Sequence, residues 1–199
     1  MQAAAFNPAS VCAAVLAGGA GSRLGGRDKG LEILTGKPLV EHVLVALQGQ
    51  AASLLICANR NGERYSRYAP VLPDATDDFR GPLAGISAAL HACNAEWLLT
   101  VPVDSPAPPR DLAARLHAAA VASGADLAAA HDGTRAQPLF ALYARSLADS
   151  AAAALHADSP VWRWQEAMGA ARADFAENAA SFENLNTPDD FLRWERAHG

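Results

Sequence analysis

The residues whose types and spacing most clearly indicate ligand chemistry form a glycine-rich stretch, AGGAGSRLGGRDKG, at positions 17–30. Glycine has no side chain, so its backbone N–H groups can turn inward and approach a phosphate closely. Arg23 and Lys29 add two positive charges to this backbone. The combination is typical of a loop that holds nucleotide phosphates, and a long loop inside a compact domain is usually functional. A solvated surface loop is the simpler interpretation, but the number of glycines argues against it.

Two well-known nucleotide-binding motifs do not fit this stretch. The dinucleotide motif GxGxxG fails because Leu24 stands where the third glycine should follow Gly19 and Gly21. The P-loop motif fails because Lys29 is followed by Gly30, with no Ser or Thr hydroxyl to ligate magnesium. The sequence therefore predicts a phosphate-binding loop of another kind.

Carboxylates follow two apolar runs that we interpret as strands. Asp74 follows Val71 and Leu72, and Asp104 follows the run 97–103. Ligands in open α/β sheets collect at the carboxyl ends of the strands, so we expect Asp104 to lie near the glycine-rich loop. One or two carboxylates with phosphate oxygens and water suit Mg²⁺. A helix cap is the simpler interpretation of Asp104, and the neighbouring loop favours the metal.

Short apolar runs alternate with longer periodic stretches along the chain, an order that predicts a parallel sheet between two layers of helices. We expect strands at 11–16, 53–57, 70–72, 97–103, 126–131, 138–143 and 173–175. The Asp132-Gly133 turn predicts a hairpin between two of them. The sequence thus indicates a three-layer, Rossmann-like α/β fold with a mostly parallel sheet and a small antiparallel arm. We expect a single domain over 1–199, with residues 1–10 as a loosely ordered extension.

The composition excludes several function classes. A net charge of −5 with scattered Lys and Arg gives no basic surface for nucleic acid or an anionic membrane. No signal peptide or membrane-spanning run is apparent, so we expect a cytoplasmic protein. The three cysteines form no CxxC pair, and no HxxxH or GxSxG motif indicates a zinc site or a serine nucleophile.

Residues 16–31, LAGGAGSRLGGRDKGL, resemble the nucleotidyltransferases that activate sugars and cofactors, and most closely the molybdenum cofactor guanylyltransferases of the MobA type. The same pattern reappears as GKPL at 36–39, NR at 59–60, GPLAG at 81–85, VPVDSP at 101–106 and NLNTP at 184–188. The resemblance implies a nucleotidyltransferase fold. It also implies an enzyme that transfers GMP from Mg-GTP to the terminal phosphate of molybdenum-loaded molybdopterin, releasing pyrophosphate and forming molybdopterin guanine dinucleotide.

The resemblance also assigns roles to individual residues. Arg23, Lys29 and Asp104 form the expected catalytic set, in which the two cations bind phosphates and Asp104 ligates Mg²⁺. The guanine is expected on the backbone of Leu16, Ala17 and Gly18, and LAGG rather than the LAAG of related cytidylyltransferases favours GTP over CTP. The remaining expected GTP contacts are Gly19, Gly26, Cys57, Asn59, Asp74, Gly81 and Gly85. Asn184 and Asn186 are expected on the molybdopterin side.

One position departs from the family pattern. Cys57 stands at a strand end where related proteins often carry a polar residue such as Asn. The contact with the nucleoside at this strand end could be made by the Cys57 side chain, by Asn59 or by the backbone.

The chemistry needs no protein base. The acceptor phosphate has a second pKa of about 6, so it is largely a dianion near neutral pH. Three alternatives remain open: a cytidylyltransferase, a sugar-phosphate nucleotidyltransferase, and a nucleotide-binding domain without turnover. The resemblance also predicts transient contact with molybdenum-inserting and cofactor-delivery proteins.

Overall fold

The structure, a computed structural model, describes residues 5–18, 28–73 and 81–198. Its main feature is a seven-stranded sheet with strand order β5-β4-β1-β6-β8-β7-β9. β8 runs antiparallel to both of its neighbours, and the other neighbouring strands are parallel. The strands are β1 (Val11–Leu16), β4 (Ser53–Cys57), β5 (Val71–Leu72), β6 (Trp97–Pro102), β7 (Leu127–His131), β8 (Ala136–Ala144) and β9 (Ala171–Asp174).

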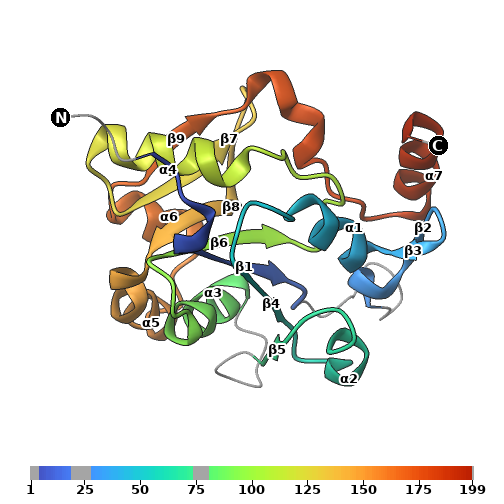
Figure 1. Cartoon of the computed structure of the whole chain (residues 1–199), viewed down its shortest axis with the longest axis horizontal. Helices are drawn as coiled ribbons and strands as arrows, with labels where there is room; N and C mark the ends of the chain where they lie inside the picture. The colour runs from blue at the N-terminus through green and yellow to red at the C-terminus, as the bar shows by residue number, and fades with distance from the viewer. Residues whose placement is uncertain (1–4, 19–27, 74–80, 199) are drawn as a thin grey trace.

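Helices cover both faces of this sheet, which confirms the expected three-layer α/β fold (Figure 1). Helices α1 and α4 pack on one face, whereas α3, α5 and α6 pack on the other. All six residues of β1 are buried, as a central strand between two helical layers requires. The helices are α1 (Leu39–Ala46), α2 (Gly62–Tyr65), α3 (Pro82–Ala92), α4 (Leu112–Ser123), α5 (Ala148–His156), α6 (Val161–Ala167) and α7 (Pro188–His198).

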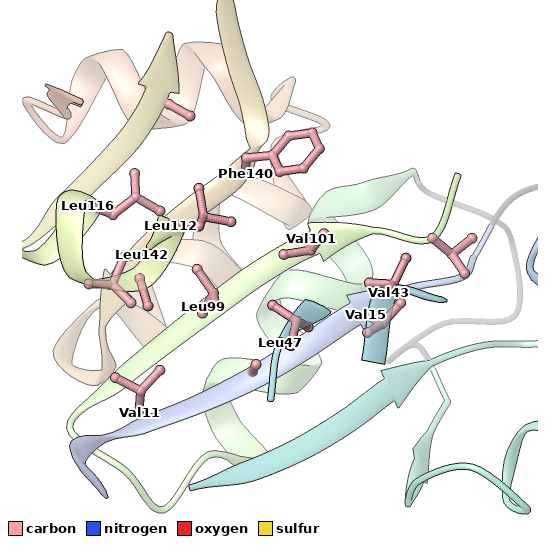
Figure 2. Close-up of a cluster of buried hydrophobic side chains, with 14 of the residues drawn as sticks. Val11, Val15, Val43, Leu47, Leu99, Val101, Leu112, Leu116, Phe140 and Leu142 are labelled. Atoms are coloured by element: carbon pink, nitrogen blue, oxygen red, sulfur yellow. The ribbon is translucent and has the colours of Figure 1, made fainter. Parts of the chain in front are cut away.

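The larger core lies between the sheet and helices α1 and α4. Figure 2 shows side chains of β1 and β6 meeting residues of α1 and α4. Burying each Val or Leu side chain contributes about 1.5 to 3 kcal/mol, so this layer holds the strand ends in place. The labelled members are Val11, Val15, Val43, Leu47, Leu99, Val101, Leu112, Leu116, Phe140 and Leu142.

The predicted hairpin around Asp132 is present, but its second strand is not a peripheral arm. β8 pairs with β6 as well as with β7, so the antiparallel strand lies inside the main sheet. The buried Asp132 carboxylate accepts hydrogen bonds from Thr134, the Arg135 backbone and Gln137. These donors, led by the Thr134 hydroxyl, hold the pKa of Asp132 well below its usual range.

A second, two-stranded sheet was not predicted. β2 (Ile33–Leu34) and β3 (Lys37–Pro38) pair as an antiparallel hairpin before α1. This hairpin and α7 enclose a small core of Leu34, Leu39 and Leu185, with Phe191 and Trp194 packed against it. Figure 1 shows α7 beside β2 and β3 at one end of the molecule.

Within the described ranges, the remaining regular elements are four 3₁₀ segments. They are η1 (Pro8–Ser10), η3 (Lys29–Leu31), η4 (Arg145–Leu147) and η5 (Ala176–Phe182). In the N-terminal residues, Phe6 packs against His117 with 5.7 Å between the ring centroids. Among the helices described here, none combines the length and apolar character that crossing a membrane requires.

Candidate functional site

The carboxyl ends of three neighbouring strands meet at one edge of the sheet. Leu16 at the end of β1 pairs with Cys57 of β4 on one side and with Pro102 of β6 on the other. The chain remains in register just beyond the strands. The Ala17 amide donates to the Cys57 carbonyl at 2.9 Å, and the Val103 amide donates to the Leu16 carbonyl at 3.1 Å. The residues that follow β1, β4 and β6 are therefore held side by side.

A small hollow opens between the end of β1 and the beginning of α3. It is lined by Leu16, Gly18, Cys57, Gly81, Pro82 and Gly85, so five residues of the expected GTP site lie together. Gly81 precedes the helix with φ 78° and ψ −173°, a backbone conformation that favours glycine. The N-terminus of α3 carries partial positive charge, which suits a negatively charged ligand nearby.

The Cys57 side chain is buried in the protein interior. It is 1% exposed, and its thiol donates to the Gly85 carbonyl with an S–O distance of 3.5 Å. Asn59 lies two residues further along and is half-buried. Either residue can still supply a backbone contact, and which of them touches a nucleoside stays a prediction.

Lys29, Asp104 and Asn186 form a polar cluster just beyond the end of β6, the strand next to β1. The Lys29 ammonium lies 3.0 Å from Asp104 Oδ2 and also donates a hydrogen bond to Asn186 Oδ1. The side chains of Lys29 and Asp104 are 21% and 19% exposed, so both remain within reach of a ligand. Three segments that are remote in sequence thus place a cation, a carboxylate and an amide at one point.

Two hydrogen bonds tie the segment 184–186 to the end of β6. The Leu185 amide donates to the Asp104 carbonyl at 2.8 Å, and the buried Ser105 hydroxyl donates to Asn184 Oδ1 at 2.7 Å. These contacts bring both predicted acceptor asparagines to the site. Ser105 was not among the expected site residues, although it lies within the VPVDSP motif.

The simpler interpretations of these polar residues do not hold. Asp104 does not cap a helix, because α4 begins after Asp111 and the Asp104 carboxylate contacts Lys29. The Asn186 side chain does not cap α7 either. The Asp190 carboxylate accepts from the amides of Asn186 and Thr187 at 2.9 and 2.8 Å. The backbone N–H groups, led by that of Asn186, hold the pKa of Asp190 below its usual value.

Four of the expected site residues lie outside the described part of the chain: Gly19, Arg23, Gly26 and Asp74. Their roles stay predictions from the sequence. Lys29 follows the first of these gaps by two residues, and Leu72 of β5 precedes the second. β5 ends beside Cys57, so the strand that leads to Asp74 ends at the same edge as the cluster.

Mg²⁺ fits the donors of this site only if the nucleotide supplies most of its ligands. Across residues 5–18, 28–73 and 81–198, no three His, Cys, Asp or Glu side chains gather in a way that could hold a metal alone. Mg²⁺ commonly binds through one or two carboxylates, substrate phosphates and water, however. The partly exposed carboxylate of Asp104, beside the Lys29 ammonium, satisfies that requirement.

Comparison with known proteins places the chain among nucleotidyltransferases. Residues 13–173 match the MobA-like NTP transferase domain. The chain is 43% identical over 181 residues to a molybdenum cofactor guanylyltransferase from Photobacterium profundum, covering 90% of this chain and 93% of that protein. A molybdenum cofactor guanylyltransferase from Vibrio cholerae is 39% identical over 194 residues, covering 97% of this chain and 95% of that protein.

Solved structures agree with this placement. Molybdopterin-guanine dinucleotide biosynthesis protein A from Archaeoglobus fulgidus has a TM-score of 0.77 at 27% identity, covering 94% of this chain and 97% of that one. The 2-C-methyl-D-erythritol 4-phosphate cytidylyltransferase from Thermus thermophilus has a TM-score of 0.67 at 20% identity, covering 96% and 98%. The second likeness shows a common fold alone. The family match and the curated relatives confirm the sequence resemblance, and the chain belongs to the molybdenum cofactor guanylyltransferases of the MobA-like NTP transferase family.

Proposed function

We propose that this protein transfers GMP from Mg-GTP to the terminal phosphate of molybdopterin, releasing pyrophosphate and forming molybdopterin guanine dinucleotide. The observation that carries the proposal is the cluster of Lys29, Asp104 and Asn186 just beyond the end of β6, which pairs with the end of β1. It combines a cation for phosphate, a carboxylate for a metal and an amide that accepts a hydrogen bond from the cation. Family membership gives the reaction class and the acceptor.

In the proposed reaction, an oxygen of the acceptor phosphate attacks the α-phosphorus of GTP. A new P–O bond forms, the bond from the α-phosphorus to its bridging oxygen breaks, and the electron pair leaves with pyrophosphate. Because the acceptor is already largely a dianion near neutral pH, no side chain must remove a proton. Catalysis then depends on placement and on neutralising charge, and correct placement alone can supply about 7 to 11 kcal/mol.

The chain's own residues divide these tasks between them. Lys29 holds the phosphates through charge-assisted hydrogen bonds, and Asn186 directs the Lys29 ammonium toward the site. Asp104 would hold Mg²⁺ together with phosphate oxygens. When bound, Mg²⁺ supplies positive charge that neutralises the triphosphate and the leaving pyrophosphate. Arg23 is proposed as a second phosphate ligand, and the hollow is proposed to receive the guanine.

Asn184 and Asn186 are proposed to face the acceptor. The Asn184 side-chain oxygen is already used by Ser105, which leaves its NH₂ group as the donor for a ligand. Asn184 is exposed and Ser105 is fully buried, so the Ser105 hydroxyl orients the Asn184 side-chain amide from the protein interior. This arrangement supports an acceptor contact at Asn184.

Pyrophosphate release with each of GTP, CTP, UTP and ATP, in the presence of molybdopterin, tests the proposal. We expect release with GTP and formation of the guanine dinucleotide. Preference for CTP would indicate a cytidylyltransferase, and turnover with a sugar phosphate in place of molybdopterin would indicate a sugar-phosphate nucleotidyltransferase. Nucleotide binding without any product would leave a non-catalytic domain. A structure with GTP and Mg²⁺ would identify the residues at the base and the metal.

We also propose transient contact with molybdenum-inserting and cofactor-delivery proteins. Molybdenum-loaded molybdopterin is reactive and poorly suited to free diffusion, which supports direct transfer between proteins. Co-purification with molybdenum-inserting proteins tests this proposal.

A further inference from the structure

The residues on either side of Lys29 are held by a single buried tyrosine. Tyr65, the last residue of α2, is 0% exposed, and its hydroxyl donates a hydrogen bond to Asp28 Oδ1. Asn61 Nδ2 donates to the other carboxylate oxygen, Asp28 Oδ2, at 2.9 Å. The Asp28 side chain makes no capping bond to η3, so its carboxylate is directed toward α2.

Gly30, on the other side of Lys29, packs directly under the same tyrosine. A Cβ at this position would lie 2.8 Å from Val103 Cγ2 and closer still to the Tyr65 hydroxyl. The contact with Val103 joins η3 to the end of β6, one residue before Asp104. The backbone at Lys29 is therefore fixed on one side through Asp28 and on the other through Gly30.

The Tyr65 hydroxyl is a reliable donor in this position. Burial, followed by the hydrogen bond to Asp28, raises the pKa of Tyr65 above its usual value. The hydroxyl keeps its proton throughout the physiological pH range and so remains the donor to the Asp28 carboxylate. A hydrogen bond to a carboxylate is stronger than one between two neutral groups.

We infer that Tyr65 is a positioning residue for Lys29, acting through Asp28 and Gly30 to aim the ammonium at Asp104 and at the nucleotide phosphates. This inference rests on the proposed function of Lys29. Neither Tyr65 nor Asp28 needs to touch a substrate. Their effect arises because the Lys29 side chain is long and flexible, so its ammonium is well placed only when the backbone beneath it is fixed.

A double-mutant cycle with Tyr65→Phe and Lys29→Ala tests this inference. The substitution Y65F removes only the hydroxyl, and we expect it to lower kcat/KM for Mg-GTP by about tenfold, as for a hydrogen bond to a charged group. In the K29A background the same substitution should have less than about a twofold effect, because the group that it positions is gone. Equal losses in both backgrounds would show a general structural effect and overturn the inference.

Tyr143→Phe is the matched control. Tyr143 is also fully buried, and its hydroxyl accepts from Gln165 at 2.7 Å. It pairs with Leu98 near the beginning of β6, at the end of that strand remote from Asp104. We expect Y143F to lower the urea midpoint while leaving kcat/KM unchanged. A loss of kcat/KM in Y143F as large as that in Y65F would also contradict a specific role for Tyr65.

Asn61→Gly provides a second variant that cannot fail through a lost core contact. Asn61 has φ 54°, a left-handed conformation that glycine adopts readily, so N61G removes the amide contact without backbone strain. We expect a loss of kcat/KM of about threefold that also disappears in the K29A background.

The two proposals can fail separately. If the unmodified protein released no pyrophosphate from GTP with molybdopterin, the proposed function would fail. The same cycle, measured as Mg-GTP affinity by calorimetry, would still decide the role of Tyr65. Non-additive affinities would support it, and additive or unchanged affinities would reject it.

Discussion

Replacing Lys29 with alanine removes the described cation nearest to Asp104. The Lys29 ammonium lies 3.0 Å from Asp104 Oδ2 and donates to Asn186, and its side chain is 21% exposed. A hydrogen bond between charged groups contributes about 1.5 to 3 kcal/mol. If that interaction is made with the nucleotide phosphates, K29A should lower kcat/KM by between about tenfold and about a hundredfold.

The same substitution should barely change the stability of the fold. The Asp104 side chain is 19% exposed, so water can solvate the carboxylate after Lys29 is removed. Partly exposed ion pairs of this kind contribute about 1 kcal/mol or less. We therefore expect the free energy of unfolding, measured by urea titration, to stay within about 1 kcal/mol of that of the unmodified protein, which separates a catalytic loss from unfolding.

Pyrophosphate release with GTP and molybdopterin measures the effect, and Lys37→Ala is the matched control. Lys37 also forms an ion pair, with Glu41 at 2.9 Å, but its side chain is 57% exposed and the pair joins β3 to the first turn of α1. K37A should leave kcat/KM unchanged. If K29A kept the full kcat/KM while folding normally, Lys29 would not belong to the site and the proposed phosphate contact would be wrong.

Three further substitutions test other parts of the structure. Asp104→Asn should lower kcat/KM by at least about tenfold and raise the Mg²⁺ concentration needed for half-maximal activity, measured by metal titration. Asp132→Asn should destabilise the fold by about 1 to 3 kcal/mol at pH 7. Because the pKa of Asp132 is lowered in the folded state, urea midpoints should show this difference shrinking as the pH falls below about 4. Gly30→Ala should lower both the urea midpoint and kcat, because its Cβ would displace Tyr65 or Val103.

Most of the sheet could be predicted because its strands have a strong local signal. The run 11–16 is apolar throughout, and the structure buries every residue of β1. The hairpin of β7 and β8 was indicated by the Asp132-Gly133 turn. The β2–β3 hairpin was not predicted, because each of its strands has only two residues and shows no alternation. Its turn residues Thr35 and Gly36 both have positive φ, at 46° and 83°.

The candidate site could be predicted as far as sheet topology determines it. Parallel strands end at the same edge, so the expectation that Asp104 lies near the end of β1 required only the strand order β1-β6. The approach of Asn186 to Lys29 is different, because the two residues are 157 positions apart and belong to segments outside the main sheet. Only the family resemblance indicated that Asn186 would come to the site.

The position of the Lys29 ammonium depends on tertiary packing, which the local sequence pattern does not contain. A strand fixes its neighbours in whole-residue steps, which is why β1 and β6 bring Leu16 and Pro102 together predictably. A lysine side chain has many rotamers, and packing must select among them. Here the selection comes from Tyr65 beneath the backbone and from Asn186 at the ammonium. Tyr65 lies between β4 and β5, and Asn186 lies after β9, so the direction of the Lys29 side chain follows only from the complete fold.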